Sequence, residues 1–144
     1  MPAEPLLKSD LPAIMAIENA SFTTPWTEEM YDSVFSDSYI SGFKWVEEGV
    51  LKGYFVYGLF PPTFEIMNVV VSPAHRRQGV GRKMMEWAAD LARQHQCTES
   101  FLEVKASNAA AIELYKSMGF EAIHTRKKYY RDGEDGLVMA SRFT

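Results

Sequence analysis

The residues most suited to bind a charged ligand follow an apolar run that is typical of a buried strand. This run, Val69-Val70-Val71, ends at Ser72-Pro73, and the glycines of Gly79-Val80-Gly81 then open a predicted helix. Glycines let backbone N–H groups approach a ligand closely, and a helix N-terminus presents unpaired N–H groups with partial positive charge. Such a turn suits a pyrophosphate. Cationic and polar side chains surround it, namely His75, Arg76, Arg77, Gln78, Arg82 and Lys83.

Other phosphate-binding loops fit this segment less well. The dinucleotide pattern needs a third glycine where Met84 stands, and the nucleotide-hydrolase pattern needs a Gly-Lys-Ser/Thr sequence that is missing. A glycine-rich turn among solvated arginines explains the two glycines alone equally well. The anion site is favoured by the combination Arg76-x-x-Gly79-x-Gly81 with a strand before it and an amphipathic helix after it.

Three further residues are of types that move protons or orient ligands, and each also has an ordinary structural explanation. Glu103 lies in a predicted strand, where alternation directs it to the opposite face from Leu102 and Val104. An exposed or lysine-paired glutamate explains Glu103 on these grounds. Tyr115 has apolar helical neighbours, so a core tyrosine explains it, while capping of the same helix explains Asn108.

Hydrophobic periodicity and capping signals predict the elements that must position these residues. Asp10 and Thr27 are expected to cap the first two helices, and Gly119 is expected to end the last. Glu48-Gly49 and Asp132-Gly133 are turn signals. The predicted helices are Leu11–Ala20, Glu28–Phe35, Gly79–His95 and Asn108–Met118, and the predicted strands are Gly42–Glu48, Leu51–Phe60, Thr63–Val71, Ser100–Ala106, Phe120–Tyr130 and Leu137–Arg142.

This order of elements predicts one α/β domain over residues 1–144. The hairpin-connected strands indicate a mostly antiparallel twisted sheet. The strand–helix–strand unit from Thr63 to Ala106, however, requires one parallel pair. The helices are then expected on both faces of the sheet.

Composition excludes several classes of function. The 144 residues carry a formal net charge of -4 and no long basic run, which argues against wholesale nucleic-acid binding. The single cysteine, Cys97, permits no intrachain disulfide, has no zinc-ligand spacing around it, and is predicted to pack in the core. No signal peptide and no apolar run long enough for a bilayer is recognisable, so a cytoplasmic protein without a metal or a membrane partner is expected.

The glycine loop resembles the acetyl-coenzyme A loop of the GNAT acetyltransferase superfamily, whose pattern is Gln/Arg-x-x-Gly-x-Gly/Ala. The likeness continues from Leu102 through Asn108 to Tyr115 and in Lys116-Ser117-Met118-Gly119-Phe120. It implies the GNAT acyl-CoA N-acyltransferase fold, whose parallel strand pair is splayed apart, and acetyl-CoA as cosubstrate. The short start of the chain departs from the family, so a first strand is expected to be weak or absent.

The resemblance also implies roles for these residues in the direct attack of an amine on the acetyl thioester. Glu103 would act as the base, ahead of Glu65 on the neighbouring strand, and Tyr115 as the acid that protonates the coenzyme sulfur. Asn108 would contact the coenzyme, and the backbone of Val69, Val70 and Val71 would hydrogen-bond its pantetheine arm. The diphosphate would lie against Arg76, Arg77, Gln78, Gly79, Val80, Gly81 and Arg82.

A third set of residues narrows the resemblance to the Nα-acetyltransferases of this superfamily. These residues are Ile17-Glu18, Pro25-Trp26, Arg126-Lys127-Lys128-Tyr129-Tyr130, Asp132-Gly133-Glu134-Asp135 and Met139. Tyr129 and Tyr130 would line the pocket for a peptide N-terminus, with Trp26 on the facing wall. The implied partner is a protein N-terminus, in particular the N-terminal alanine of a ribosomal small-subunit protein, and a monomer or weak homodimer is expected.

Two other functions are compatible with the same residues. A GNAT enzyme for a small-molecule amine or a lysine side chain would keep the same loop, base and acid. A coenzyme-binding module without activity would have no need of Glu103 and Tyr115. Around the site, His75 is expected to be solvated, and exposed acids are expected at most to orient a positive peptide. These acids are Glu18, Glu28, Glu29 and Asp135.

Overall fold

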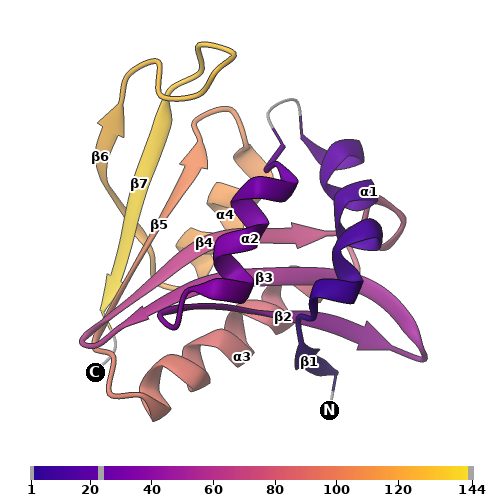
Figure 1. Cartoon of the computed structure of the whole chain (residues 1–144). Helices are drawn as coiled ribbons and strands as arrows, with labels where there is room; N and C mark the ends of the chain where they lie inside the picture. The colour runs from indigo at the N-terminus through magenta and orange to yellow at the C-terminus, as the bar shows by residue number, and fades with distance from the viewer. Residues whose placement is uncertain (1, 23–24, 143–144) are drawn as a thin grey trace.

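The centre of the protein is a seven-stranded sheet with the strand order β1-β2-β3-β4-β5-β7-β6 (Figure 1). The structure, a computed structural model, describes residues 2–22 and 25–142. The β4–β5 pair is parallel, and the other strand pairs are antiparallel, as predicted. The strands are β1 (Ala3–Pro5), β2 (Ile40–Glu47), β3 (Val50–Phe60), β4 (Thr63–Val71), β5 (Glu99–Lys105), β6 (Glu121–Arg126) and β7 (Gly136–Arg142).

Helices cover both faces of this sheet, which confirms the predicted mixed α/β fold (Figure 1). α1 and α2 bury Tyr54, Val56 and Val70 on one face, and α3 and α4 cover the other face. Within the described residues, no helix is long and apolar enough to cross a membrane. The helices are α1 (Leu11–Ser21), α2 (Glu28–Ser36), α3 (Val80–Gln94) and α4 (Ala109–Ser117), with short 3-10 turns η1 (Lys8–Asp10) and η2 (Pro73–His75).

The core between α3 and the sheet fixes where the glycine loop can lie. Met84, Met85, Ala88 and Ala92 are buried along one side of α3, at the helical spacing that the sequence predicts. Cys97 is buried in the same cluster, which confirms its predicted packing role. Each Å² of apolar surface removed from water contributes roughly 25 cal/mol. This burial holds α3 against the sheet, and its first turn, where Val80 is buried, lies beside Val71 at the end of β4.

The ends of the helices agree with the sequence in two places and differ in one. The Thr27 hydroxyl accepts the backbone N–H of Met30 at 3.2 Å, which confirms the cap of α2, and Gly119 follows α4 with φ +94°. Asp10 stands at the N-cap position of α1, as predicted, but among the described residues its side chain makes no capping hydrogen bond to that helix. The Asp10 carboxylate instead accepts the backbone N–H of Leu7 at 2.8 Å and pairs with Lys44 at 2.8 Å.

One edge of the sheet agrees with the prediction and the other differs. The first strand, expected to be weak or absent, is present but short, because only Ala3–Pro5 pairs with β2. At the other edge β6 ends at Arg126 rather than Tyr130. The chain turns there because Lys128 has φ +50° and donates its backbone N–H to the Asp135 carboxylate at 3.0 Å. Tyr129 and Tyr130 consequently lie in the β6–β7 loop, not on an edge strand.

The parallel pair separates halfway along its length. Pairing between β4 and β5 stops at Ile66 and Leu102, and Figure 1 shows the two strands running apart. Met67 follows as an extra residue opposite β3, where the register shifts between Val56 and Tyr57. Such a bulge bends and twists its strand. Residues 67–71 of β4 therefore have no strand partner on the β5 side within the described part of the chain, and a gap opens between the strands.

Candidate active site

Two connected cavities occupy the gap between the diverging strands. The larger has a volume of about 1030 Å³ and opens beside α2 and the β6–β7 loop. The smaller, of about 150 Å³, is called the deeper cavity here because the buried residues Glu18 and Tyr115 line it, together with residues of β4 and β5. Both are lined by Trp26, Ile66, Met67, Leu102, Glu103 and Tyr130. A ligand that filled the deeper cavity would therefore be accessible from the larger one.

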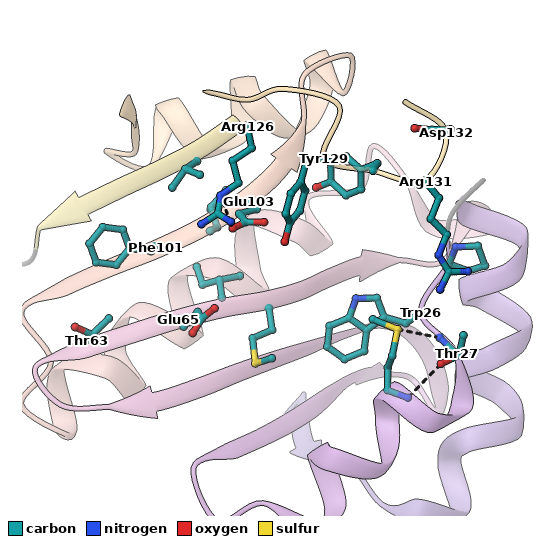
Figure 2. Close-up of a pocket in the computed structure, with 17 residues that line it drawn as sticks. Trp26, Thr27, Thr63, Glu65, Phe101, Glu103, Arg126, Tyr129, Arg131 and Asp132 are labelled. Atoms are coloured by element: carbon teal, nitrogen blue, oxygen red, sulfur yellow. Dashed lines mark hydrogen bonds and ion pairs between the residues drawn. The ribbon is translucent and has the colours of Figure 1, made fainter. Parts of the chain in front are cut away.

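Glu103 stands where the two cavities meet. It is the first residue of β5 beyond the last β4–β5 pair, and its carboxylate lies on the opposite face from Leu102 and Val104, as alternation predicts. Its side chain is 31% exposed and lies 3.4 Å from the guanidinium Nε of Arg126. The Tyr129 hydroxyl donates a hydrogen bond to it. Figure 2 shows Glu103 and Tyr129 together on one side of the cavity and Trp26 on the other.

Glu65 occupies a different part of the same wall. Its backbone pairs with Phe101, one position before the last β4–β5 pair. It lines the larger cavity but not the deeper one. Glu103, in contrast, reaches the deeper cavity as well. Of the two carboxylates that compete for the role of base, Glu103 is therefore the one that shares a cavity with Tyr115.

Tyr115 reaches the deeper cavity from α4. Its side chain is 8% exposed, and it lines the cavity together with Asn108 and Glu103. Burial, with a smaller contribution from Tyr130, raises the pKa of the Tyr115 hydroxyl to about 12. The hydroxyl therefore keeps its proton at neutral pH and can donate it into the cavity. Its ring meets Phe120 edge to face at 6.2 Å, so it also serves the packing role that the sequence suggests.

The β6–β7 loop brings two tyrosines to the mouth of the site. Tyr130 lines both cavities, and burial, followed by the charge of Glu103, raises its pKa to about 12. Tyr129 lines the larger cavity, and its hydrogen bond to Glu103 is the main cause that raises its pKa. The loop is tied to the end of β5 by the ion pair Lys105–Asp132 and the hydrogen bond Ser107–Glu134. These contacts hold the tyrosines over the gap.

The glycine loop follows the end of β4, and none of residues 76–82 is among those that line the two cavities. Gly79 stands at the start of α3 with φ +79°, and Arg77 also has positive φ, +63°. No side chain caps the N-terminus of α3 within the described residues, so its first N–H groups are available to an anion. Gly81 has a second role, because a Cβ there would lie 3.2 Å from Leu114 Cδ2 of α4. Its missing side chain lets the two helices pack closely.

The cations of the loop are not all free to meet a ligand. Arg82 donates to the Ser117 hydroxyl at 2.6 Å and so ties α3 to the end of α4. Lys83 pairs with Glu47 at 3.2 Å, and this hydrogen bond is the main reason why the pKa of Glu47 is lowered. Arg76 Nε donates to the Val71 carbonyl at 3.4 Å. Arg77, Gln78 and Gly79 are exposed, and Val80 is buried beneath the turn.

Asn108 and the valines at the end of β4 lie along the gap between the diverging strands. The Asn108 amide oxygen accepts the backbone N–H of Ala111 at 3.2 Å, which confirms that it caps α4. It also lines the deeper cavity together with Val69. Val70 is buried under α1 and α2, and Val71 packs on the opposite face. Because β4–β5 pairing ends before these valines, their backbone groups on the β5 side face the gap.

Two side chains near the site differ from their predicted environments. His75 is predicted to be solvated, but it is partly buried, and its Nδ1 has no hydrogen-bond partner within the described residues. Glu18 is predicted to be exposed, but it is 1% exposed and lines the deeper cavity. Glu18 lies four residues after Ile14, on the buried side of α1, and this spacing is the signal that could have revealed it.

The sequence does not single out several other residues that line the cavities. Met67 is the bulge residue of β4 and lines both cavities, while Phe22 and Lys105 line the deeper one. No periodicity or motif marks a bulge, so Met67 could be found only from the fold. Among the described residues there is no group of three or more histidine, cysteine or acidic side chains that could hold a metal ion.

Comparisons with known proteins agree with this geometry. The family model described as "Acetyltransferase (GNAT) family" matches residues 11–120. The chain is 35% identical over 135 residues to the [ribosomal protein bS18]-alanine N-acetyltransferase of Escherichia coli strain K12, covering 92% of this chain and 90% of that protein. It is 31% identical over 138 residues to the enzyme of the same name from Salmonella typhimurium, covering 94% and 93%.

A solved structure shares the whole arrangement. The crystal structure of the ribosomal-protein-S18-alanine N-acetyltransferase from Escherichia coli superposes with a TM-score of 0.90 at 32% identity, covering 99% of this chain and 93% of that one. The splayed β4–β5 pair, the uncapped helix after the glycine turn and the matched family model agree with one another. The chain therefore belongs to the GNAT family and is an acetyl-CoA-dependent N-acetyltransferase.

Proposed function

We propose that this chain, acting as one domain, transfers the acetyl group of acetyl-CoA to the α-amino group of a protein N-terminus, with the N-terminal alanine of a ribosomal protein as substrate. The observation that carries the proposal is that Glu103 and Tyr115 line the same deep cavity of about 150 Å³. The larger cavity beside it is bounded by Trp26, Tyr129 and Tyr130. Relatives that are named for this reaction on protein bS18 support the choice of substrate.

Three features support acetyl-CoA as the cosubstrate at this site. The uncapped N-terminus of α3 offers backbone N–H groups to the diphosphate. On the side of the gap, no described strand pairs with the backbone of Val69, Val70 and Val71, so this backbone is available to hydrogen-bond the pantetheine arm. Asn108 flanks the same gap. Acetyl-CoA supplies an activated thioester, and these residues would set its reacting end between Glu103 and Tyr115.

The proposed reaction needs one proton acceptor and one proton donor. The amine nitrogen attacks the thioester carbonyl carbon, the C–N bond forms and the C–S bond breaks. Glu103 takes the proton that the nitrogen loses, directly or through a water, and Tyr115 gives its proton to the departing sulfur. The task of the base is modest, because an α-amine has a reference pKa of about 7.7–8.0, against about 10.4 for lysine.

A panel of amines tests the substrate. We expect rapid acetylation of a peptide with a free N-terminal alanine, and no acetylation of the same peptide when its α-amine is formylated. The product would be followed by mass gain and by release of the free thiol. A lysine-containing peptide blocked at its N-terminus and a polyamine complete the panel. Faster modification of either of these two would contradict the Nα proposal and favour the lysine or small-molecule reading.

Replacement of Gly79 by alanine tests the anion site. The new side chain meets no described residue within 4 Å, so the change acts by disfavouring φ +79°, at a cost of roughly 1 kcal/mol. We expect the KM for acetyl-CoA to rise about fivefold, with the KM for the peptide unchanged. Gly49→Ala is the matched control, since Gly49 has φ +75° and open space around it in the β2–β3 turn. An equal rise in both variants would argue against a diphosphate site at this turn.

A further inference from the structure

The Glu18 carboxylate is enclosed in the protein and fully engaged in hydrogen bonds. It is 1% exposed, and burial of a carboxylate is costly unless hydrogen bonds replace its water. One oxygen, Oε1, accepts from the hydroxyls of Tyr31 at 2.8 Å and Tyr54 at 2.7 Å and from the Asn68 amide at 3.1 Å. The other oxygen, Oε2, accepts the backbone N–H of Trp26 at 2.9 Å.

The partners of the two oxygens belong to different parts of the protein. Tyr31, Tyr54 and Asn68 lie on α2, β3 and β4, so the Oε1 contacts join α1 to the elements packed beneath it. Trp26 lies between α1 and α2, outside any helix or strand. Its side chain lines both cavities, and its ring packs against Tyr31 at 5.0 Å. The Oε2 bond thus attaches a cavity wall to the rigid body of the protein.

We infer that Glu18 is a positioning residue for substrate binding: its Oε2 anchors the Trp26 backbone and thereby fixes the wall against which the peptide N-terminus docks. The inference rests on the proposed function, since it takes the cavity beside Trp26 as the peptide site. Glu18 itself lines the deeper cavity, but within residues 2–22 and 25–142 its four hydrogen bonds satisfy both carboxylate oxygens with protein groups. Its effect on the reaction is therefore exerted through Trp26.

Glutamine at position 18 would separate the two tasks of the carboxylate. The amide has one oxygen and one NH₂ group. Of the donors in the described part of the chain, three point at the Oε1 position and one points at the Oε2 position. The amide oxygen will face the three donors, which leaves its NH₂ group against the Trp26 N–H. Glu18→Gln thus keeps the core contacts and breaks the anchor. Tyr54→Phe is the matched control, because it removes a bond to Oε1 and leaves the Oε2 bond intact.

Steady-state kinetics with the alanine peptide and acetyl-CoA measure the result. We expect Glu18→Gln to raise the KM for the peptide about tenfold, which corresponds to the loss of about 1.4 kcal/mol, with the KM for acetyl-CoA changed less than about twofold. Tyr54→Phe is expected to lower the melting temperature and to leave both KM values unchanged. A folded Glu18→Gln protein with an unchanged peptide KM would overturn the inference, as would an equal rise in Tyr54→Phe.

Hydrogen exchange on the unaltered protein gives a second test that does not depend on a folded variant. The Trp26 amide is expected to exchange at least about tenfold more slowly than an open amide, because its N–H is bonded to a buried oxygen. Exchange at the rate of an open amide would overturn the inference. The proposed function has a different test: it would be contradicted if the unaltered enzyme did not acetylate the alanine peptide.

Discussion

Glu103→Gln is expected to lower kcat/KM for the alanine peptide about 100-fold at pH 7, since a positioned general base contributes about 10²–10⁴ in rate. The amide keeps the size of the side chain and can still accept the hydrogen bond from Tyr129, but it cannot take a proton from the amine. We expect the KM for acetyl-CoA to stay within about threefold of its original value, because no residue of the glycine loop lines either cavity that Glu103 lines. Thiol release at several peptide concentrations measures both quantities.

The loss of activity in Glu103→Gln is expected to depend on pH. The variant must rely on amine that has already lost its proton in solution, and that fraction grows as the pH rises through about 7.7–8.0. The deficit of Glu103→Gln should therefore shrink between pH 7 and pH 9, where the neutral amine becomes the main form. A deficit that is constant with pH would point to a role in orientation rather than in proton transfer.

Glu65→Gln is the matched control for Glu103→Gln. Both are carboxylates on the same face of neighbouring strands, but Glu65 lies before the point where β4 and β5 separate. We expect Glu65→Gln to retain kcat within about threefold, as expected when no transition-state contact is lost. A larger loss in Glu65→Gln than in Glu103→Gln would reverse the assignment of the base.

Tyr115→Phe is expected to lower kcat about 30-fold, with little change in the KM of either substrate. The ring and its contact with Phe120 remain, so the decrease in kcat is caused by the absence of the hydroxyl proton. The effect is smaller than that of Glu103→Gln because the reference pKa of a thiol, about 8.5, makes the departing sulfur weakly basic. Single-turnover measurements of thiol release isolate this step from product release.

The raised pKa of Tyr115 predicts the shape of the pH profile. Because the hydroxyl titrates near 12 in the folded protein, it stays protonated throughout the neutral range. The kcat of the unaltered enzyme should show no decline from loss of this proton between about pH 7 and pH 10. Tyr57→Phe is the control, since Tyr57 stacks on Phe64 in the core and lines neither cavity. A kcat in Tyr115→Phe equal to that in Tyr57→Phe would refute the acid role.

Glu103 owes its position to two contacts that the sequence could not relate to one another. Arg126 lies at the end of β6 and Tyr129 in the loop after it, and both meet the carboxylate of a residue on β5. The ion pair and the hydrogen bond hold the carboxylate at the junction of the two cavities. An exposed ion pair of this kind contributes little to stability, about 0–1 kcal/mol. We therefore infer that the Arg126–Glu103 ion pair mainly orients the carboxylate and adds little to the stability of the fold.

Local patterns in the sequence determined most of the elements, because these patterns act over a few residues. The apolar spacing of α3, the Thr27 cap and the left-handed glycine after α4 each depend on neighbours within one or two turns of the chain. The glycine turn at the start of α3 could be found in the same way. Alternation along β5 correctly directed Glu103 and Val104 to opposite faces.

Tertiary structure alone decided how these elements meet. The bulge at Met67 separates β4 from β5 and creates the cavities, and no local preference marks that residue. The acid at position 18 is buried because Tyr31, Tyr54 and Asn68, between 13 and 50 residues away, converge on it. Asp10 turns to Lys44, 34 residues away, instead of capping α1. Contacts between distant residues depend on the packing of whole elements, and sequence spacing carries no record of that packing.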